Sequence, residues 1–233
     1  RREAAVTRHL ERMHPVAVPI PGIALALALL VPATFVPVAR AALPTFQGTI
    51  TSADLCSPRG VAITPEGYIM VASDCTTPHI NRYNPAGALS LSWTFFPGYQ
   101  GSPNGIAIDG SGNLFVTDYE AGSFQKYTLF GSLLGAWGTA LGPTDIAVND
   151  AGEVYVACLH GRSVGKYRND GQYLGPIGSA GTGPGQFQEP TGIGVDAAGR
   201  VYVADAGRGR VIRFGADGSF DMEFPTPAVP YDV

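Results

Sequence analysis

A pattern of proline, glycine and aromatic residues repeats along the 233-residue chain from residue 56 onward, and it constrains the fold more than any other feature. Prolines recur at spacings of 45, 40, 47 and 40 residues, at Pro58, Pro103, Pro143, Pro190 and Pro230. Nine residues after each of the first four comes a turn glycine, namely Gly67, Gly112, Gly152 and Gly199. An aromatic residue closes each third β-rich run and a second glycine follows four residues later, at Tyr83 and Gly87, Tyr127 and Gly131, Tyr167 and Gly171, and Phe214 and Gly218. Short β-rich runs separated by turns, at a period of about 40 to 50 residues, predict an all-β propeller built from four-stranded antiparallel blades.

The repeat also predicts where the parts of each blade lie. Four blades are expected, and their inner strands, which line the central axis, should begin near Gly60, Gly105, Asp145 and Gly192. The first turn of a blade should begin with a side chain that bonds the local backbone, at Asp109, Asn149 and Asp196. Helix is expected only before residue 39.

The fourth blade contains the most regular copy of the repeat. It reads Pro-Thr-Gly-Ile-Gly-Val-Asp-x-x-Gly-x-Val-Tyr-Val-Ala-Asp from Pro190 to Asp205, preceded by Gly-Gln-Phe at 185–187, and it resembles the NHL repeat. The resemblance covers about residues 56–233 and is weakest in the first blade, where one residue is inserted between Val71 and Tyr83. It implies a propeller, commonly of six blades, but no particular function, because propellers carry many unrelated sites.

The last four residues match the opening of the third blade. Pro-Tyr-Asp-Val at 230–233 aligns with Pro-Thr-Asp-Ile at 143–146, which predicts the start of a fifth blade and a fragment of a larger ring. An incomplete ring should leave the inner strand at 61–63 beside a gap. It should also expose the apolar residues Ile212 and Phe214 on the fourth blade.

The segment 1–41 has the pattern of a targeting sequence. Four arginines precede an uncharged apolar run at 15–38, and Ala39-Arg40-Ala41 fits a small-x-small cleavage site. These features predict a signal peptide cleaved near Ala42, and the alternative is an uncleaved membrane anchor. Either one exports the propeller, so a secreted or cell-envelope location is expected. The lead-in at 42–55 is either a closing outer strand around 46–50 or a plain linker.

Charge limits the possible partners. Residues 42–233 carry 10 Lys and Arg against 17 Asp and Glu, a net charge of −7. Nucleic-acid binding needs a basic face, so a nucleic-acid partner is not expected.

The three cysteines have separate expected roles. Cys56 precedes the first inner strand and Cys75 follows the second strand, so both should lie on the same face of the propeller. In an exported protein, this arrangement predicts a disulfide. Cys158 is expected to be a small core residue at a loop mouth. In two other blades its position is taken by Asp118 and Asp205, which should accept hydrogen bonds from the following loop or meet an arginine such as Arg210.

The candidate binding residues follow the blade-opening prolines and should ring the mouth of the central channel: Arg59, Asn104, Thr144, Asp145, Thr191 and Tyr231, with Asp232 beside them. The peptide-amidating lyase, which is similar in fold, places zinc-binding histidines directly after these prolines, and here none of the five residues at those positions is His. The second strands also lack the Trp-Phe-Thr-Glu-like pattern of virginiamycin lyases. His79 and His160 are weak metal candidates in loops of non-adjacent blades.

These observations favour a non-catalytic binding or scaffold module that engages a protein, peptide or glycan at the cell envelope, without a cofactor. The alternative is a propeller lyase or hydrolase, similar to the amidating lyase or to gluconolactonase, with a metal in the central channel. Arg59, Asn104 and Asp145 would then surround that metal.

Overall fold

The computed structural model describes residues 49–50, 55–95 and 101–233. The chain divides into a unit at Arg1–Gln47 and a unit at Gly48–Val233, and the described residues all belong to the second. The predicted signal peptide or anchor and most of the lead-in lie outside the described residues. Thr49 and Ile50 are described and belong to no strand. Within the described ranges, no helix is long and apolar enough to cross a membrane.

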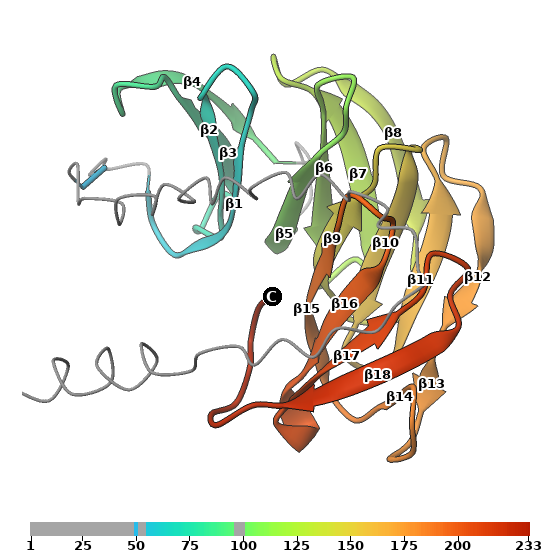
Figure 1. Ribbon diagram of the computed structural model, residues 1–233. Helices are drawn as coiled ribbons and strands as arrows, with labels where there is room; N and C mark the ends of the chain where they lie inside the picture. Colours follow the sequence, from blue (N-terminus) through green and yellow to red (C-terminus); the bar gives the residue numbers. More distant parts are fainter. Residues whose placement is uncertain (1–48, 51–54, 96–100) are drawn as a thin grey trace, which may run out of the picture. The chain divides into compact units, whose positions relative to one another are not determined.

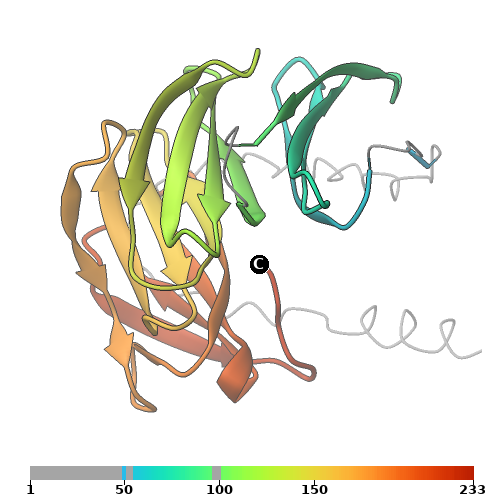
Figure 2. The same cartoon turned by 180° about the vertical axis from the view of Figure 1, so that it is seen from behind.

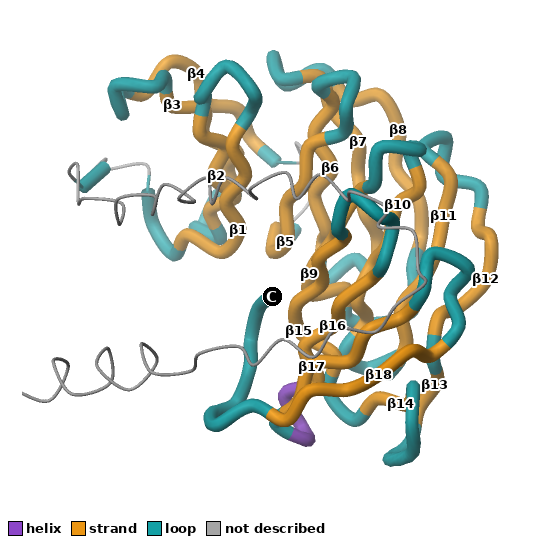
Figure 3. Tube along the Cα trace, viewed as in Figure 1, coloured by secondary structure: helices purple, strands orange, loops and turns teal. Residues whose placement is uncertain are grey.

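The described part of the second unit consists mainly of four sheets of four antiparallel strands, and in each of them the strands are ordered as in the sequence (Figures 1 and 3). The predicted blades are therefore confirmed. Their bounds are β1 Pro58–Ile63, β2 Ile69–Ser73, β3 His79–Tyr83 and β4 Leu89–Thr94 in blade one; β5 Pro103–Ile108, β6 Asn113–Asp118, β7 Ser123–Thr128 and β8 Leu133–Gly138 in blade two; β9 Pro143–Val148, β10 Glu153–Cys158, β11 Ser163–Arg168 and β12 Tyr173–Ile177 in blade three; and β15 Pro190–Val195, β16 Val201–Asp205, β17 Arg210–Phe214 and β18 Phe220–Pro225 in blade four.

The first turn of a blade forms as the sequence predicts. The Asp109 carboxylate accepts hydrogen bonds from the backbone N–H groups of Ser111 at 2.9 Å and Asn113 at 2.8 Å. Gly112 has a φ of 77°, a conformation that costs glycine little and other residues much. Asn149 and Asp196 make the same kind of bond in blades three and four. This turn chemistry sets the register of the first two strands in each of these blades.

Glycines let the inner strands of consecutive blades approach each other closely. A Cβ atom on Gly105 would lie 2.4 Å from the Cα atom of Asp145 in the next inner strand, and one on Gly60 would lie 2.3 Å from the carbonyl oxygen of Asn104. Real Cβ atoms do not come that close to a neighbouring backbone, so these positions require glycine.

The hydrophobic core consists of clusters that each draw on two consecutive blades. Met70 and Ile80 of blade one pack with Leu114 and Val116 of blade two. A second cluster joins blades two and three, and a third joins blades three and four. The aromatic and β-branched residues that favour strands therefore also fill the space between blades.

Three short elements near blade four were not predicted. Ser179–Ala180 (β13) pairs in parallel with Gln186–Phe187 (β14), and Ala206–Arg208 forms a 3-10 helix (η1). The side chain of Phe187 is fully buried, and its ring centroid lies 5.7 Å from that of Phe214. The glycine-rich lead-in to blade four therefore folds back and anchors its aromatic residue in the core.

The predicted exposure of apolar residues is right in one place and wrong in another. On β1, Val61 and Ile63 are 64% and 66% exposed, as expected. Ile212 and Phe214 were expected to be exposed, but they are 0% and 1% exposed. Their side chains belong to the cluster shared with blade three, and the apolar residues that blade four exposes lie instead on its outer strand β18, at Phe220, Met222 and Phe224.

The last residues run along β15 in the way that β15 runs along β9 (Figure 2). Thr144 Oγ1 donates to the Pro190 carbonyl oxygen at 3.3 Å, and Thr191 Oγ1 donates to the Pro230 carbonyl oxygen at 3.3 Å. Residues 231–233 form no strand, but they occupy the place of the next inner strand.

Candidate functional site at the channel mouth

All the predicted channel residues line one cavity of about 490 Å³, which we call the mouth cavity. Its lining consists of Arg59, Asn104, Thr144, Asp145, Thr191, Tyr231 and Asp232, together with Pro58, Gly60, Val61, Gly105 and Ile106. The structure brings the polar residues together because each follows a blade-opening proline, at the same end of its inner strand.

One cation lies at the rim of this cavity. The Arg59 guanidinium is 3.4 Å from the Asp74 carboxylate, and half of the Arg59 side chain is exposed. Asp74 also accepts a hydrogen bond of 3.3 Å from the Ser102 hydroxyl. An exposed pair of this kind contributes about 0–1 kcal/mol, so little free energy is lost if Arg59 turns toward a ligand.

Asp145 is the most deeply placed carboxylate of the mouth cavity. Its Oδ1 accepts a hydrogen bond from the N–H of Ile146 and its Oδ2 accepts one from the N–H of Ile193, both at 2.8 Å. Burial raises the pKa of Asp145 to about 7, and the nearby negative charge of Asp232 acts in the same direction, while the two N–H donors act against it. Asp145 therefore changes charge near neutral pH.

The other polar groups of the mouth cavity differ in whether they already form hydrogen bonds within the protein. The hydroxyls of Thr144 and Thr191 bond backbone carbonyl oxygens. Within the described residues, the Asn104 amide and the Tyr231 hydroxyl form no hydrogen bond with the protein, and Tyr231 is 73% exposed. Asn104 and Tyr231 are thus free to bind a ligand.

A second cavity of about 450 Å³ adjoins the first, since Thr191 and Tyr231 line both. Its other residues are Leu159, His160, Arg162, Gln188, Glu189, Ala206 and Val229. Sequence reasoning did not identify Arg162 or Glu189. The available signal was topological: residues before a blade-opening proline and residues in the loop between second and third strands share one end of the blade.

The two histidines predicted as weak metal candidates, His79 and His160, lie in separate environments in the structure. The His160 Nε2 atom lies 2.8 Å from the Tyr119 hydroxyl of blade two, within hydrogen-bond distance. His79 begins β3, opposite Ser73 and Thr94. Among the residues that the structure describes, no group of three or more His, Cys, Asp or Glu side chains could hold a metal ion.

The cysteines behave as predicted. Cys56 and Cys75 form a disulfide with their Cα atoms 5.5 Å apart. Cys158 is a free thiol with no exposed surface, and burial raises its pKa to about 11. Cys158 is therefore a core residue and not a reactive one.

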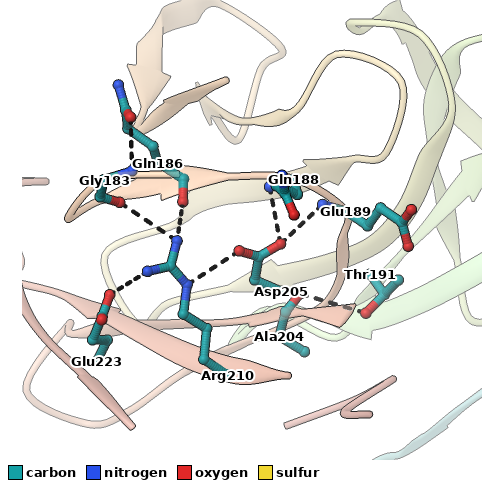
Figure 4. Close-up of polar contacts among 9 residues, drawn as sticks. All are labelled: Gly183, Gln186, Gln188, Glu189, Thr191, Ala204, Asp205, Arg210 and Glu223. Atoms are coloured by element: carbon teal, nitrogen blue, oxygen red, sulfur yellow. Dashed lines mark hydrogen bonds and ion pairs between the residues drawn. The ribbon is translucent and has the colours of Figure 1, made fainter. Parts of the chain in front are cut away.

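Asp118 and Asp205 also occupy the predicted environment. Asp205 Oδ1 accepts backbone hydrogen bonds from Gln188 at 3.0 Å and Glu189 at 2.9 Å, and its Oδ2 accepts one of 3.2 Å from Arg210 Nε (Figure 4). Asp118 Oδ1 accepts backbone hydrogen bonds from Ser102, the counterpart of Glu189, and from Ala121 in the loop that follows Asp118. Both carboxylates hold neighbouring loops in place.

A family model described as NHL repeat matches residues 187–214. This range runs from the buried Phe187 through β15 and β16 to the end of β17. A search of curated proteins found no match to the sequence.

Several solved structures share the fold. A nidogen–laminin complex is 18% identical with a TM-score of 0.66, covering 78% of this chain and 70% of that chain. A streptogramin B lyase is 17% identical with a TM-score of 0.62, covering 76% and 57%. A gluconolactonase from Xanthomonas campestris is 21% identical with a TM-score of 0.61, covering 75% and 64%. The chain thus spans less than two thirds of the two enzymes. At these identities, the likeness establishes the β-propeller fold.

Proposed function

Because the chain is a β-propeller that carries an NHL repeat, we propose that it is an exported, non-catalytic binding module. In this proposal the mouth cavity binds a segment of a protein, peptide or glycan. One observation carries the proposal: polar residues from five successive repeats, which the sequence places far apart, line a single cavity of about 490 Å³. Ligand sites are typically concave surfaces of this size with a few convergent polar groups.

The chemistry of the mouth cavity suits a ligand rich in hydroxyl and amide groups. Asn104 offers an amide that both donates and accepts, Tyr231 offers an exposed ring with a polar tip, and Arg59 offers a cation. The carboxylate of Asp232, of which only Oδ1 accepts a backbone N–H group among the described residues, can accept a further hydrogen bond. Sugars and peptide backbones present matching donors and acceptors, and an aromatic ring can pack on their apolar faces.

The hydrogen bonds of the site give less support to the enzyme alternative. A metal bound near Arg59, Asn104 and Asp145 would need free anionic oxygens, but both oxygens of Asp145 already accept backbone N–H groups. Asn104 is a neutral ligand and Arg59 repels a metal cation. The donor set therefore fits an organic ligand better than a metal ion.

Export rests on the disulfide and on the N-terminal sequence. A disulfide between Cys56 and Cys75 persists where the environment is oxidising, as outside the cytosol. The segment 1–41 has the charge and hydropathy pattern of an export signal.

The test is a screen of the protein on glycan and peptide arrays, followed by calorimetry with the best ligand. A variant with Asn104→Ala and Tyr231→Ala should lose binding by about tenfold or more, equivalent to roughly 1.4 kcal/mol. The matched control is Asp150→Ala, an exposed residue in the turn at the other end of β9, which should leave binding unchanged.

Equal affinity in the double variant and the Asp150→Ala control would contradict the proposal. The enzyme alternative would be favoured if calorimetry showed stoichiometric binding of Zn²⁺ or Ca²⁺ that Asp145→Asn abolished, because the mouth cavity would then be a metal site.

A further inference from the structure

Blade four contains a network of charged groups around the buried Arg210 (Figure 4). The Arg210 guanidinium bonds the Asp205 carboxylate at 3.2 Å, the Glu223 carboxylate, and the Gln186 carbonyl oxygen at 2.6 Å. Asp205 is fully buried and Arg210 is 5% exposed. The arginine therefore supplies a donor to the Asp205 carboxylate, which has lost water, and also bonds the more exposed carboxylate of Glu223.

Blade two has the same strand register but lacks the arginine. Asp205 pairs with Arg210 across β16 and β17, and Asp118 pairs with Ser123 across β6 and β7. Likewise Ile212 pairs with Glu223, whereas Gln125 pairs with Ala136. The buried aspartate is thus kept in blade two, while the arginine and glutamate are replaced by the small residues serine and alanine.

A cavity of about 330 Å³ occupies this place in blade two, and we call it the blade-two cavity. Asp118 and Gln125, which are 0% and 1% exposed, are its buried members. The rest of the lining is Ala121, Ser123, Ala136, Trp137 and Gly138. Ala121, Ala136 and Gly138 are exposed, so the cavity opens to solvent on this side.

Two acceptor atoms of the blade-two cavity are buried without a partner. Asp118 uses its Oδ1 for the N–H groups of Ser102 and Ala121, but its Oδ2 has no hydrogen-bond partner among the described residues. Gln125 donates from Nε2 to Ser123 at 3.2 Å, and its Oε1 has no partner within the same described part of the chain. Leaving such atoms unpaired costs free energy, so a group with several donors would bind them favourably.

We propose that the blade-two cavity binds a guanidinium group. In blade four, the chain's own guanidinium fills the corresponding place beside the corresponding aspartate. A guanidinium is planar, carries several N–H donors and stacks on aromatic rings, so it can bond Asp118 Oδ2 and Gln125 Oε1 while lying near Trp137. The group comes either from a small guanidino compound or from an arginine side chain of another protein.

The experiment measures binding of acetyl-arginine amide to the full, oxidised chain by tryptophan fluorescence and NMR, because Trp137 lines the cavity. Acetyl-citrulline amide, which has nearly the same shape without the charge, is the control and should bind at least about tenfold more weakly. Asp118→Asn should weaken the arginine probe to a similar extent. Ser123→Arg should abolish probe binding and raise the melting temperature, since it places the guanidinium within the chain.

The reverse change is made in blade four. Arg210→Ser should lower the melting temperature and create a second site, so that the arginine probe restores part of the loss while the citrulline probe does not. To separate the two sources, a panel of short arginine peptides is compared with the arginine probe. Tighter binding of a peptide points to a protein partner, and equal binding points to a small compound.

Equal binding of the arginine and citrulline probes would overturn the proposal. It would also be overturned if the Ser123→Arg chain folded with a lower melting temperature and still bound the probe. If Asp118→Asn failed to fold, the Ser123→Arg variant would decide, because it keeps Asp118.

Discussion

The carboxylate of Asp145 in blade three accepts a hydrogen bond of 2.8 Å from the backbone N–H of Ile193 in blade four. The inner strands of these two blades are thus joined by a side chain that titrates. Blades one, two and four have glycine at the position of Asp145, as Gly60, Gly105 and Gly192. The seam between blades three and four therefore differs from the other seams in its response to pH.

The first prediction concerns this pH response. Because the pKa of Asp145 is raised to about 7 in the folded state, folding disfavours its ionised form. Its contribution to the free energy of unfolding is full below the unfolded pKa of about 3.9 and falls as pH rises toward 7. Asp145→Asn cannot ionise, so its stability relative to the wild type should increase as pH rises from about 4 to about 7 and should then level off. Urea unfolding across this range measures the difference, and a constant difference would contradict the assignment.

A second prediction concerns the disulfide. Replacing Cys56 and Cys75 by serine should lower the free energy of unfolding by roughly 3 kcal/mol in the chain-entropy model. Thiol titration of the denatured wild type should find one free thiol, that of Cys158. Three thiols in protein purified without reductant would show that the bridge does not form.

Close packing of the inner strands leads to a third prediction. Gly105→Ala places a methyl group 2.4 Å from the Asp145 Cα atom, and a backbone atom cannot move aside cheaply. The substitution should cost at least about 1–3 kcal/mol of unfolding free energy. Gly110→Ala, in the next turn, meets nothing within 4 Å and should change stability by less than about 0.5 kcal/mol. Equal effects of the two substitutions, measured by chemical denaturation, would show that the strands can separate.

The sequence was sufficient to predict the blades because each has the same alternation of strand and turn. The β13–β14 pair escaped prediction because it lies in a glycine-rich run without periodicity, and its place depends on Phe187 entering the core. The error over Ile212 and Phe214 has a similar origin. Strand alternation separates two faces, but only the packing of blade three against β17 shows which face is covered.

The candidate site was also predictable only in part, since the sequence indicates where its residues lie and not which hydrogen bonds they form. Repeat phase alone places Arg59 and Tyr231 on one end of the propeller, although many residues separate them. The bond between Asp145 and Ile193 was not predictable, because it depends on the offset between two inner strands. The unpaired oxygen of Asp118 could not be found from sequence either, since Asp118 and Asp205 look alike until the position of Ser123 or Arg210 opposite them is known.

The buried ion pair of blade four supports the last prediction. Arg210→Met leaves Asp205 buried without its partner and should cost about 3–5 kcal/mol of unfolding free energy. Arg213 lies on the same strand as Arg210 and forms a more exposed ion pair with Asp221. Arg213→Met removes this pair and should cost about 0–1 kcal/mol of unfolding free energy. Similar costs for the two variants would mean that solvent reaches Asp205.

Each hydrophobic cluster of this protein is shared by two blades, and this has a consequence for how the chain can change. A blade in which both sides of the sheet are altered loses its fit to both neighbouring blades. Matched changes on the two facing sides of consecutive blades preserve the packing between those blades. The unit that can be exchanged between such proteins is then the pair of facing surfaces, not the repeat seen in the sequence.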